Sequence, residues 1–139
     1  MTHSENPSIN TELIALRWGD FDRFQHVTNS AYIEIAQEAR MAFAQREFTS
    51  RGLEIPAVFV RKVEAEYLRP ILPNTTHVRV ETQVVEIGTS SFTTRQELYD
   101  ATNTLTCIIE VVQIVVDPTT ARPRALTQPE LNVLTMVTE

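Results

Sequence analysis

The sequence predicts an α+β domain in which a curved antiparallel sheet wraps one long central helix. Three observations predict this fold class: one segment has apolar side chains at helical spacing, the segments after it alternate like strands, and short turn sequences separate those strands. Consecutive strands with short connections pair antiparallel, and a sheet with one apolar face needs a helix to cover it. We expect a single domain over residues 1–139.

The first strand is predicted at residues 12–18, and residues 1–11, which are polar and contain a proline, are expected to be flexible. The helix follows at residues 30–50. Its apolar stripe consists of Tyr32, Ile35, Ala36, Ala39 and Phe43. Thr28 and Asn29 are N-cap residue types just before this stripe, and Gly52 is well placed to end the helix.

The remaining strands are predicted at residues 62–68, 77–87, 91–99 and 104–116, joined by short turns. Val63, Ala65 and Tyr67 alternate with charged neighbours, which predicts a half-buried strand. The last strand is rich in β-branched residues and almost free of charge, as expected of a central strand. A short helix from Glu130 is predicted in the tail.

Composition narrows the function. The net charge is −6 and no segment concentrates Lys or Arg, which weighs against nucleic acid as a partner. The single cysteine, Cys107, cannot form an internal disulfide and is expected in the core. No signal peptide or membrane span is apparent, so we expect a cytoplasmic protein without membrane contact. The histidines have no metal-ligand spacing, and no metal or cofactor is expected.

The loop GDFDRFQHVT, residues 19–28, gathers carboxylate, imidazole and aromatic side chains just before the helix. The first helical turn has N–H groups without intrahelical partners and a partial positive charge, so a nearby carboxylate stays ionised. A carboxylate beside free amide donors suits attack on a carbonyl that develops negative charge. From the loop alone, the alternative for Asp22 is an Asx turn or a helix cap.

Residues 17–32, RWGDFDRFQHVTNSAY, resemble the signature of hotdog-fold thioesterases of the 4-hydroxybenzoyl-CoA thioesterase type, roughly R-W-x-D-x-D-x-x-G-H-V-N-N-x-x-Y. The similarity continues through Glu38-Ala39-Arg40, Tyr67-Leu68-Arg69-Pro70 and Gly88-Thr89-Ser90-Ser91-Phe92, and it covers about residues 12–117. It implies the hotdog fold and hydrolysis of acyl-CoA or acyl-carrier thioesters.

The resemblance assigns Asp22 as nucleophile or general base, and the Asn29 backbone N–H as the donor to the thioester oxygen. Substrate contacts are expected from Gln25, His26, Thr28, Tyr32, Arg69 and Ser91. His26 is expected to orient the loop by hydrogen bonding, and Asp20 to have a structural or solvent role.

Three positions depart from the family pattern. Gln25 stands where glycine is usual and Thr28 where asparagine is usual, while Gln37 occupies a helix position that is often acidic, with Glu34 and Glu38 nearby. A glycine accepts unusual φ/ψ values, so Gln25 is expected either to follow another backbone path or to narrow the site.

By resemblance we expect a homodimer or homotetramer with active sites at the subunit boundary. One alternative is a hotdog dehydratase or hydratase, whose H-x-x-x-x-P-G pattern is absent from this sequence. The other is a non-catalytic hotdog module that binds acyl-CoA, which the changes at Gln25 and Gln37 favour. The acyl group itself stays open.

Overall fold

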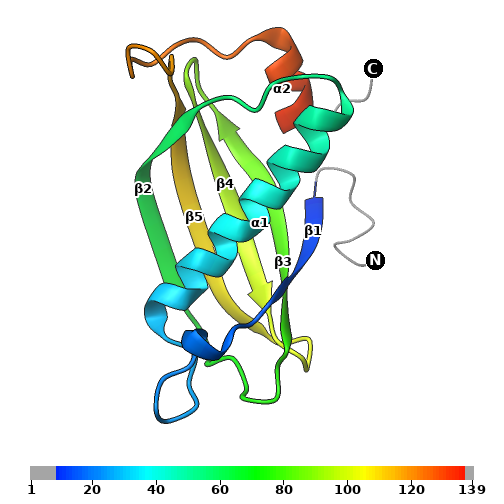
Figure 1. Cartoon of the computed structure of the whole chain (residues 1–139), viewed down its shortest axis with the longest axis vertical. Helices are drawn as coiled ribbons and strands as arrows, with labels where there is room; N and C mark the ends of the chain where they lie inside the picture. The colour runs from blue at the N-terminus through cyan, green and yellow to red at the C-terminus, as the bar shows by residue number, and fades with distance from the viewer. Residues whose placement is uncertain (1–8, 137–139) are drawn as a thin grey trace.

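The computed structural model describes residues 9–136, and these form one curved sheet, one long helix and shorter helical segments (Figure 1). In chain order the elements are β1 (Ile9–Ala15), the 3-10 turn η2 (Trp18–Asp20), α1 (Asn29–Ser50), β2 (Val58–Tyr67), β3 (His77–Ile87), β4 (Ser91–Tyr99), β5 (Leu105–Val115) and α2 (Gln128–Leu134). The predicted α+β class is confirmed. Among the described residues, no helix has both the length and the apolar composition needed to cross a bilayer.

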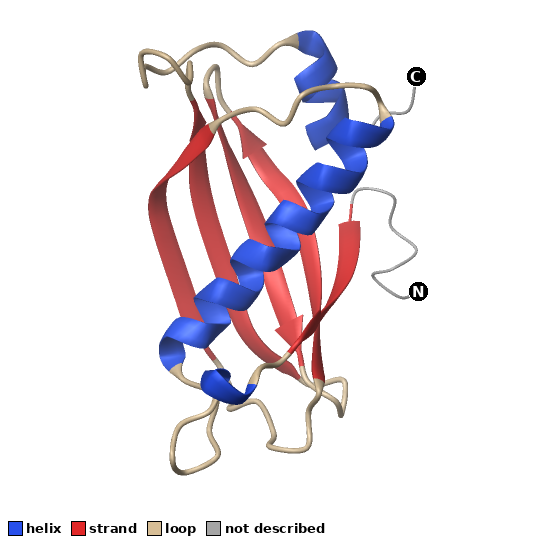
Figure 2. Ribbon diagram, viewed as in Figure 1, coloured by secondary structure: helices blue, strands red, loops and turns tan. Residues whose placement is uncertain are grey.

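The sheet has the strand order β1-β3-β4-β5-β2, and every neighbouring pair is antiparallel. It curves around α1, which runs diagonally across its concave face (Figure 2). This arrangement of one sheet wrapped around one helix is the predicted hotdog architecture.

The connection after β2 differs from the prediction. We expected short turns between four successive strands, but β2 pairs with β5 and occupies the edge of the sheet farthest from β1. Residues 68–76 carry the chain past the start of α1 to β3 (Figure 1). The amides of Leu68 and Arg69, at the start of this connection, both donate to the carbonyl of Thr106. The connection is therefore a crossover that leaves β2 with one free edge.

Helix α1 matches its predicted limits closely. Thr28 is the N-cap, and its hydroxyl oxygen accepts the N–H of Ala31 at 3.3 Å. At the other end, Gly52 has a φ of 70°, a conformation that glycine adopts at little cost. The predicted stripe is buried, and Ala36 and Ala39 are fully enclosed, so the backbone of α1 approaches the sheet closely.

Strand β2 is far more exposed than predicted. Val63 and Tyr67 retain 37% and 43% of their accessible surface, and only Ala65 is partly buried. The strand also begins four residues before the predicted start, at Val58. It lies at the sheet edge, where no further strand continues the sheet and much of its surface stays uncovered.

Strand β1 begins at Ile9, which pairs with Gln83 of β3. Residues 9–11, expected to be flexible, are therefore part of the sheet, while residues 1–8 lie outside the described part of the chain. The strand ends at Ala15 instead of at residue 18, because residues 18–20 turn into η2.

Candidate active site

Residues 21–27 form a closed loop between η2 and α1. Phe21 and Val27 pair as an antiparallel bridge at its base. The amide of Asp22 donates to the carbonyl of His26 at 2.8 Å, and the amide of Thr28 donates to the carbonyl of Asp20 at 2.9 Å. These bonds hold the loop directly before the first turn of α1.

The carboxylate of Asp22 takes part in this loop. Its Oδ1 accepts the amide N–H of Phe24 at 2.8 Å and that of His26 at 3.0 Å. The amide of His26, followed by that of Phe24, lowers the pKa of Asp22 below its ordinary value and outweighs partial desolvation. Asp22 is therefore ionised at neutral pH. The Asx-turn geometry considered for this residue is present at Oδ1, and Oδ2 has no hydrogen bond within residues 9–136.

Asp22 borders a solvent-facing hollow of about 320 Å³. The other lining residues are Trp18, Phe21, Arg23 and Gln25. Trp18 is 95% exposed, which is unusual for so large an apolar side chain. Trp18 and Phe21 were not among the predicted site residues, although aromatic residues beside aspartates in a polar loop are a signal that indicates such a site.

Asn29 is the first residue of α1, and its amide N–H has no acceptor among the hydrogen bonds of the described chain. Its carbonyl accepts the hydroxyl of Tyr67 at 2.9 Å, which ties the helix start to the end of β2. The helix therefore presents a free donor and the positive end of its dipole just after the Asp22 loop.

Tyr32 supports the helix start from inside. It is 4% exposed, its ring meets that of Tyr67 edge to face at 5.1 Å, and its hydroxyl accepts the amide of Ile71 at 3.1 Å. The structure therefore places Tyr32 in the core instead of in the hollow. Arg69, close to Tyr67 in the chain, has an exposed side chain.

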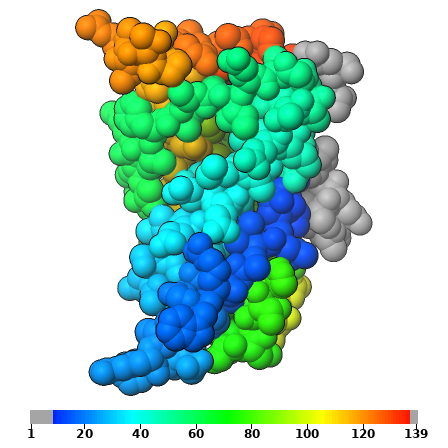
Figure 3. Space-filling model, in the orientation of Figure 1, coloured from blue at the N-terminus to red at the C-terminus, as the bar shows by residue number. Residues whose placement is uncertain are grey.

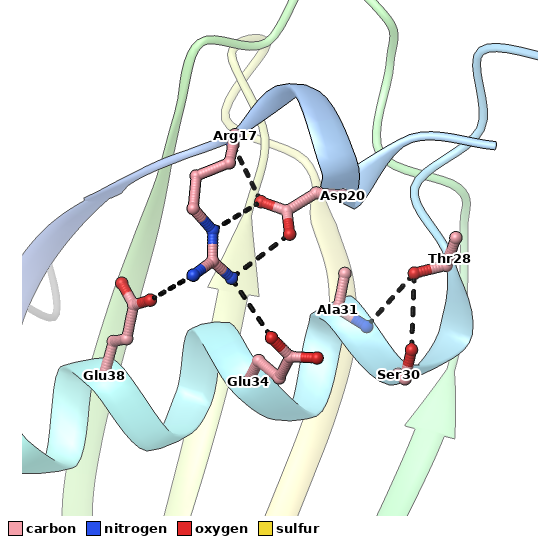
Figure 4. A network of polar contacts seen from close by, with 7 residues as sticks. All are labelled: Arg17, Asp20, Thr28, Ser30, Ala31, Glu34 and Glu38. Carbon is pink, nitrogen blue, oxygen red and sulfur yellow. Dashed lines mark hydrogen bonds and ion pairs between the residues drawn. The ribbon is translucent and has the colours of Figure 1, made fainter.

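Arg17 links the turn η2 to α1 (Figure 4). Its guanidinium lies 3.2 Å from Asp20, and also 3.2 Å from both Glu34 and Glu38 on the helix. Asp20 is 5% exposed and also accepts the backbone N–H of Arg17 at 2.8 Å. Asp20 therefore has the structural role expected of it, and the two glutamates that flank Gln37 face Arg17.

Ser91 lies at the opposite end of the sheet from the Asp22 loop. Leu98 and Tyr67 both pair with Cys107, at the end of the sheet where Tyr67 meets α1. Ser91 precedes Leu98 by seven residues on β4, which amounts to about 23 Å at the usual rise of a strand. Within one chain, the structure therefore gathers Asp22, Gln25, His26, Thr28 and Asn29 but not Ser91.

The remaining loop residues contribute local hydrogen bonds and backbone conformation. His26 hydrogen-bonds within the loop by its amide and carbonyl, whereas its ring is exposed and has no hydrogen bond in the described residues. The hydroxyl of Thr28 is engaged by the helix cap. Gln25 has a φ of 64°, the left-handed conformation that favours glycine. Gln25 therefore keeps the unusual backbone conformation expected of glycine at this family position.

Replacing Gln25 with glycine is expected to raise the free energy of unfolding by about 0.5–1 kcal/mol, because a side chain in the left-handed region costs about 1–2 kcal/mol, part of which the flexibility of glycine in the unfolded chain offsets. Gln25→Val is expected to lower it, since β-branched residues tolerate this region least. Urea denaturation of the three proteins measures both changes. A loss of stability in Gln25→Gly would contradict the assigned backbone strain.

Comparison with known proteins places the chain in a family. Residues 16–132 match the thioesterase-like superfamily. The acyl-CoA thioester hydrolase YbgC of Escherichia coli O6:H1 is 28% identical over 116 residues, which are 81% of this chain and 86% of that protein.

Solved structures agree on the fold. A predicted thioesterase from Bacillus stearothermophilus superposes with a TM-score of 0.79 at 20% identity, over 91% of this chain and 93% of the other. A Thermus thermophilus thioesterase, solved with coenzyme A and Zn, superposes with a TM-score of 0.76 at 23% identity, over 91% and 92% of the two chains. With the family match spanning most of its length, the chain belongs to the thioesterase-like superfamily and has the hotdog fold.

Proposed function

We propose that this protein hydrolyses acyl-CoA thioesters to the free acid and CoA. The observation that carries the proposal is an ionised, loop-held Asp22 that borders an open hollow and is followed, seven residues later, by the unpartnered Asn29 amide at the start of α1. The family and the likeness to an acyl-CoA thioester hydrolase support the same reaction.

In the proposed reaction, the thioester oxygen accepts a hydrogen bond from the Asn29 N–H as negative charge develops on it. Asp22 either attacks the carbonyl carbon directly or removes a proton from the attacking water. The carbon–sulfur bond then breaks, and its electron pair leaves on the sulfur as a thiolate. By the direct route, water next hydrolyses the acyl-aspartyl anhydride. Both routes consume one water and yield the acid and the thiol.

The other predicted contact residues are assigned supporting roles. Gln25 and the exposed Trp18 border the hollow in which the acyl group or the pantetheine arm would lie. His26 and Thr28 shape the loop and the helix start through their hydrogen bonds. Arg69 offers an exposed cation near the same end of β2, where it suits a phosphate of CoA.

The test is release of free thiol from a panel of short-chain, long-chain, aromatic and hydroxylated acyl-CoAs. The proposal expects at least one to be cleaved well above the uncatalysed rate. If several acyl-CoAs bind but none is cleaved, the protein is an acyl-CoA-binding module. The role of Asp22 is then limited to accepting the two loop amides.

We further propose that two copies pair through β2, so that the site is completed by the partner. The exposed side chains of this edge strand include Val58, Phe59, Val60, Val63 and Tyr67. An apolar strand edge is a ready template for a second chain. Antiparallel pairing about a two-fold axis turns the second sheet end for end. The sheet end that carries Ser91 in one protomer then lies beside the Asp22 loop of the other.

Val63→Lys is expected to convert the dimer to a monomer and to lower kcat/KM together with it, because the two introduced charges approach each other across the paired strands. Light scattering at micromolar concentration measures the mass, and thiol release measures the activity. Leu13→Lys, at a 66% exposed position on the opposite edge strand β1, is the matched control and should change neither. A wild-type monomer, or an unchanged mass for Val63→Lys, would refute the β2 interface.

A further inference from the structure

A second cavity lies under the other half of α1. It opens between that half of the helix and residues 55–58, over the sheet, and Figure 3 shows the hollow between these segments. Its volume is about 60 Å³, and its walls are mainly apolar. The apolar lining includes Phe43, Phe48, Ile55, Phe92, Leu126 and Leu134.

One arginine faces this apolar space without a counter-charge. Nη1 of Arg40 donates to Oε1 of Gln96 at 2.8 Å, and no carboxylate of residues 9–136 forms an ion pair with it. Gln96 is fixed in turn by the carbonyl of Ala36 and the hydroxyl of Thr82. Burial lowers the pKa of Arg40 to about 10, so it remains a cation at neutral pH. A partly buried cation with only a neutral side-chain partner is stabilised when an anion joins it.

A second polar group at the same cavity also lacks a partner. The hydroxyl of Thr94 is buried and makes no hydrogen bond in the structure. It lines the cavity together with Thr82 and Gln113, on the sheet side of the space that Arg40 enters from the helix. Buried hydroxyls are nearly always hydrogen-bonded, so the unpaired Thr94 calls for an acceptor placed in this cavity.

We propose that this cavity is a binding site for a short-chain monocarboxylate. The carboxylate accepts hydrogen bonds from the guanidinium of Arg40 and the hydroxyl of Thr94, and the apolar tail lies against Phe43, Phe48 and Phe92. The volume corresponds to about four to six water-sized positions, which suits an acid of about four carbons. Because the cavity is open, a longer tail would protrude toward solvent.

Within one protomer, this cavity is separate from the Asp22 loop. Arg40 follows Asn29 by eleven residues along α1, which is about 16 Å of helix. Between these two residues, the fully buried Ala36 and Ala39 pack the helix closely against the sheet. Binding of a free carboxylate is measured without a thioester and without turnover, so the test does not depend on whether the protein hydrolyses acyl-CoA.

Binding of butyrate to the full-length protein, measured by calorimetry and by NMR of the arginine Nε–H signals, tests the proposal. Arg40→Gln is expected to weaken butyrate binding at least tenfold, and the neutral analogue butyramide is expected to bind at least tenfold more weakly than butyrate to the wild type. Arg122→Gln removes the same charge from an exposed loop and should leave binding unchanged.

Two further variants keep the test decisive if Arg40→Gln fails to fold. Thr94→Val removes the unpaired hydroxyl with little change of shape, so it should fold normally and bind butyrate several-fold more weakly. Ala44→Leu fills part of the cavity and should also reduce binding. If the wild type binds no butyrate, or if binding survives both substitutions unchanged, the cavity holds only water and the proposal is wrong.

Discussion

Replacing Asp22 with asparagine is expected to lower kcat for acyl-CoA hydrolysis on the order of 10²-fold or more, with little change in KM. The asparagine side chain keeps an oxygen equivalent to Oδ1, so it still accepts the amides of Phe24 and His26 and the loop stays closed. Only the negative charge and basicity of the side chain are lost. Steady-state thiol release measures the loss, and unchanged acyl-CoA binding shows that the site is intact.

The matched control is Asp20→Asn, two residues away at the end of η2. Asp20 is buried against Arg17, so its replacement should lower the denaturation midpoint and leave kcat within a few-fold of the wild type. A similar fall in kcat for both variants would point to damage to the loop. An Asp22→Asn enzyme with full activity would remove Asp22 from the reaction.

The predictability of each strand follows from its neighbours. The predicted limits of residues 77–87 and 91–99 coincide with β3 and β4, because alternate side chains of these inner strands face a buried core. The start and the burial of strand β2 could not be predicted in this way. Its first residues, Val58 to Val60, are consecutively apolar and do not alternate. The sequence of β2 also does not indicate that the strand pairs with β5 at an open edge of the sheet.

The candidate site likewise has some features that could be predicted from the sequence and others that could not. The motif located a carboxylate loop ahead of the helix and a capped helix start, since both are local features of residues 20–31. The burial of Tyr32, the capture of Glu34 and Glu38 by Arg17, and the remoteness of Ser91 depend on tertiary placement. No spacing within the sequence contains that information.

Replacing Asn29 with proline is expected to lower kcat by about 10²–10³-fold, because it removes the one N–H that the mechanism aims at the thioester oxygen. Proline is well suited to this position, since the N–H of the first helical residue has no intrahelical acceptor to lose. The preceding Thr28 already has the extended conformation that a following proline requires, with φ −68° and ψ 151°. The helix and its cap should therefore survive, which circular dichroism and the denaturation midpoint would verify.

Asn29→Ala is the decisive comparison, because it discards the side chain but retains the backbone N–H. If the amide is the donor, Asn29→Ala should keep kcat within a few-fold of the wild type while Asn29→Pro loses it. Equal losses in both variants would show that the side chain matters more than the amide. Equal activity in both would mean that the thioester oxygen is stabilised elsewhere, and Asp22 would then need a different electrophilic partner.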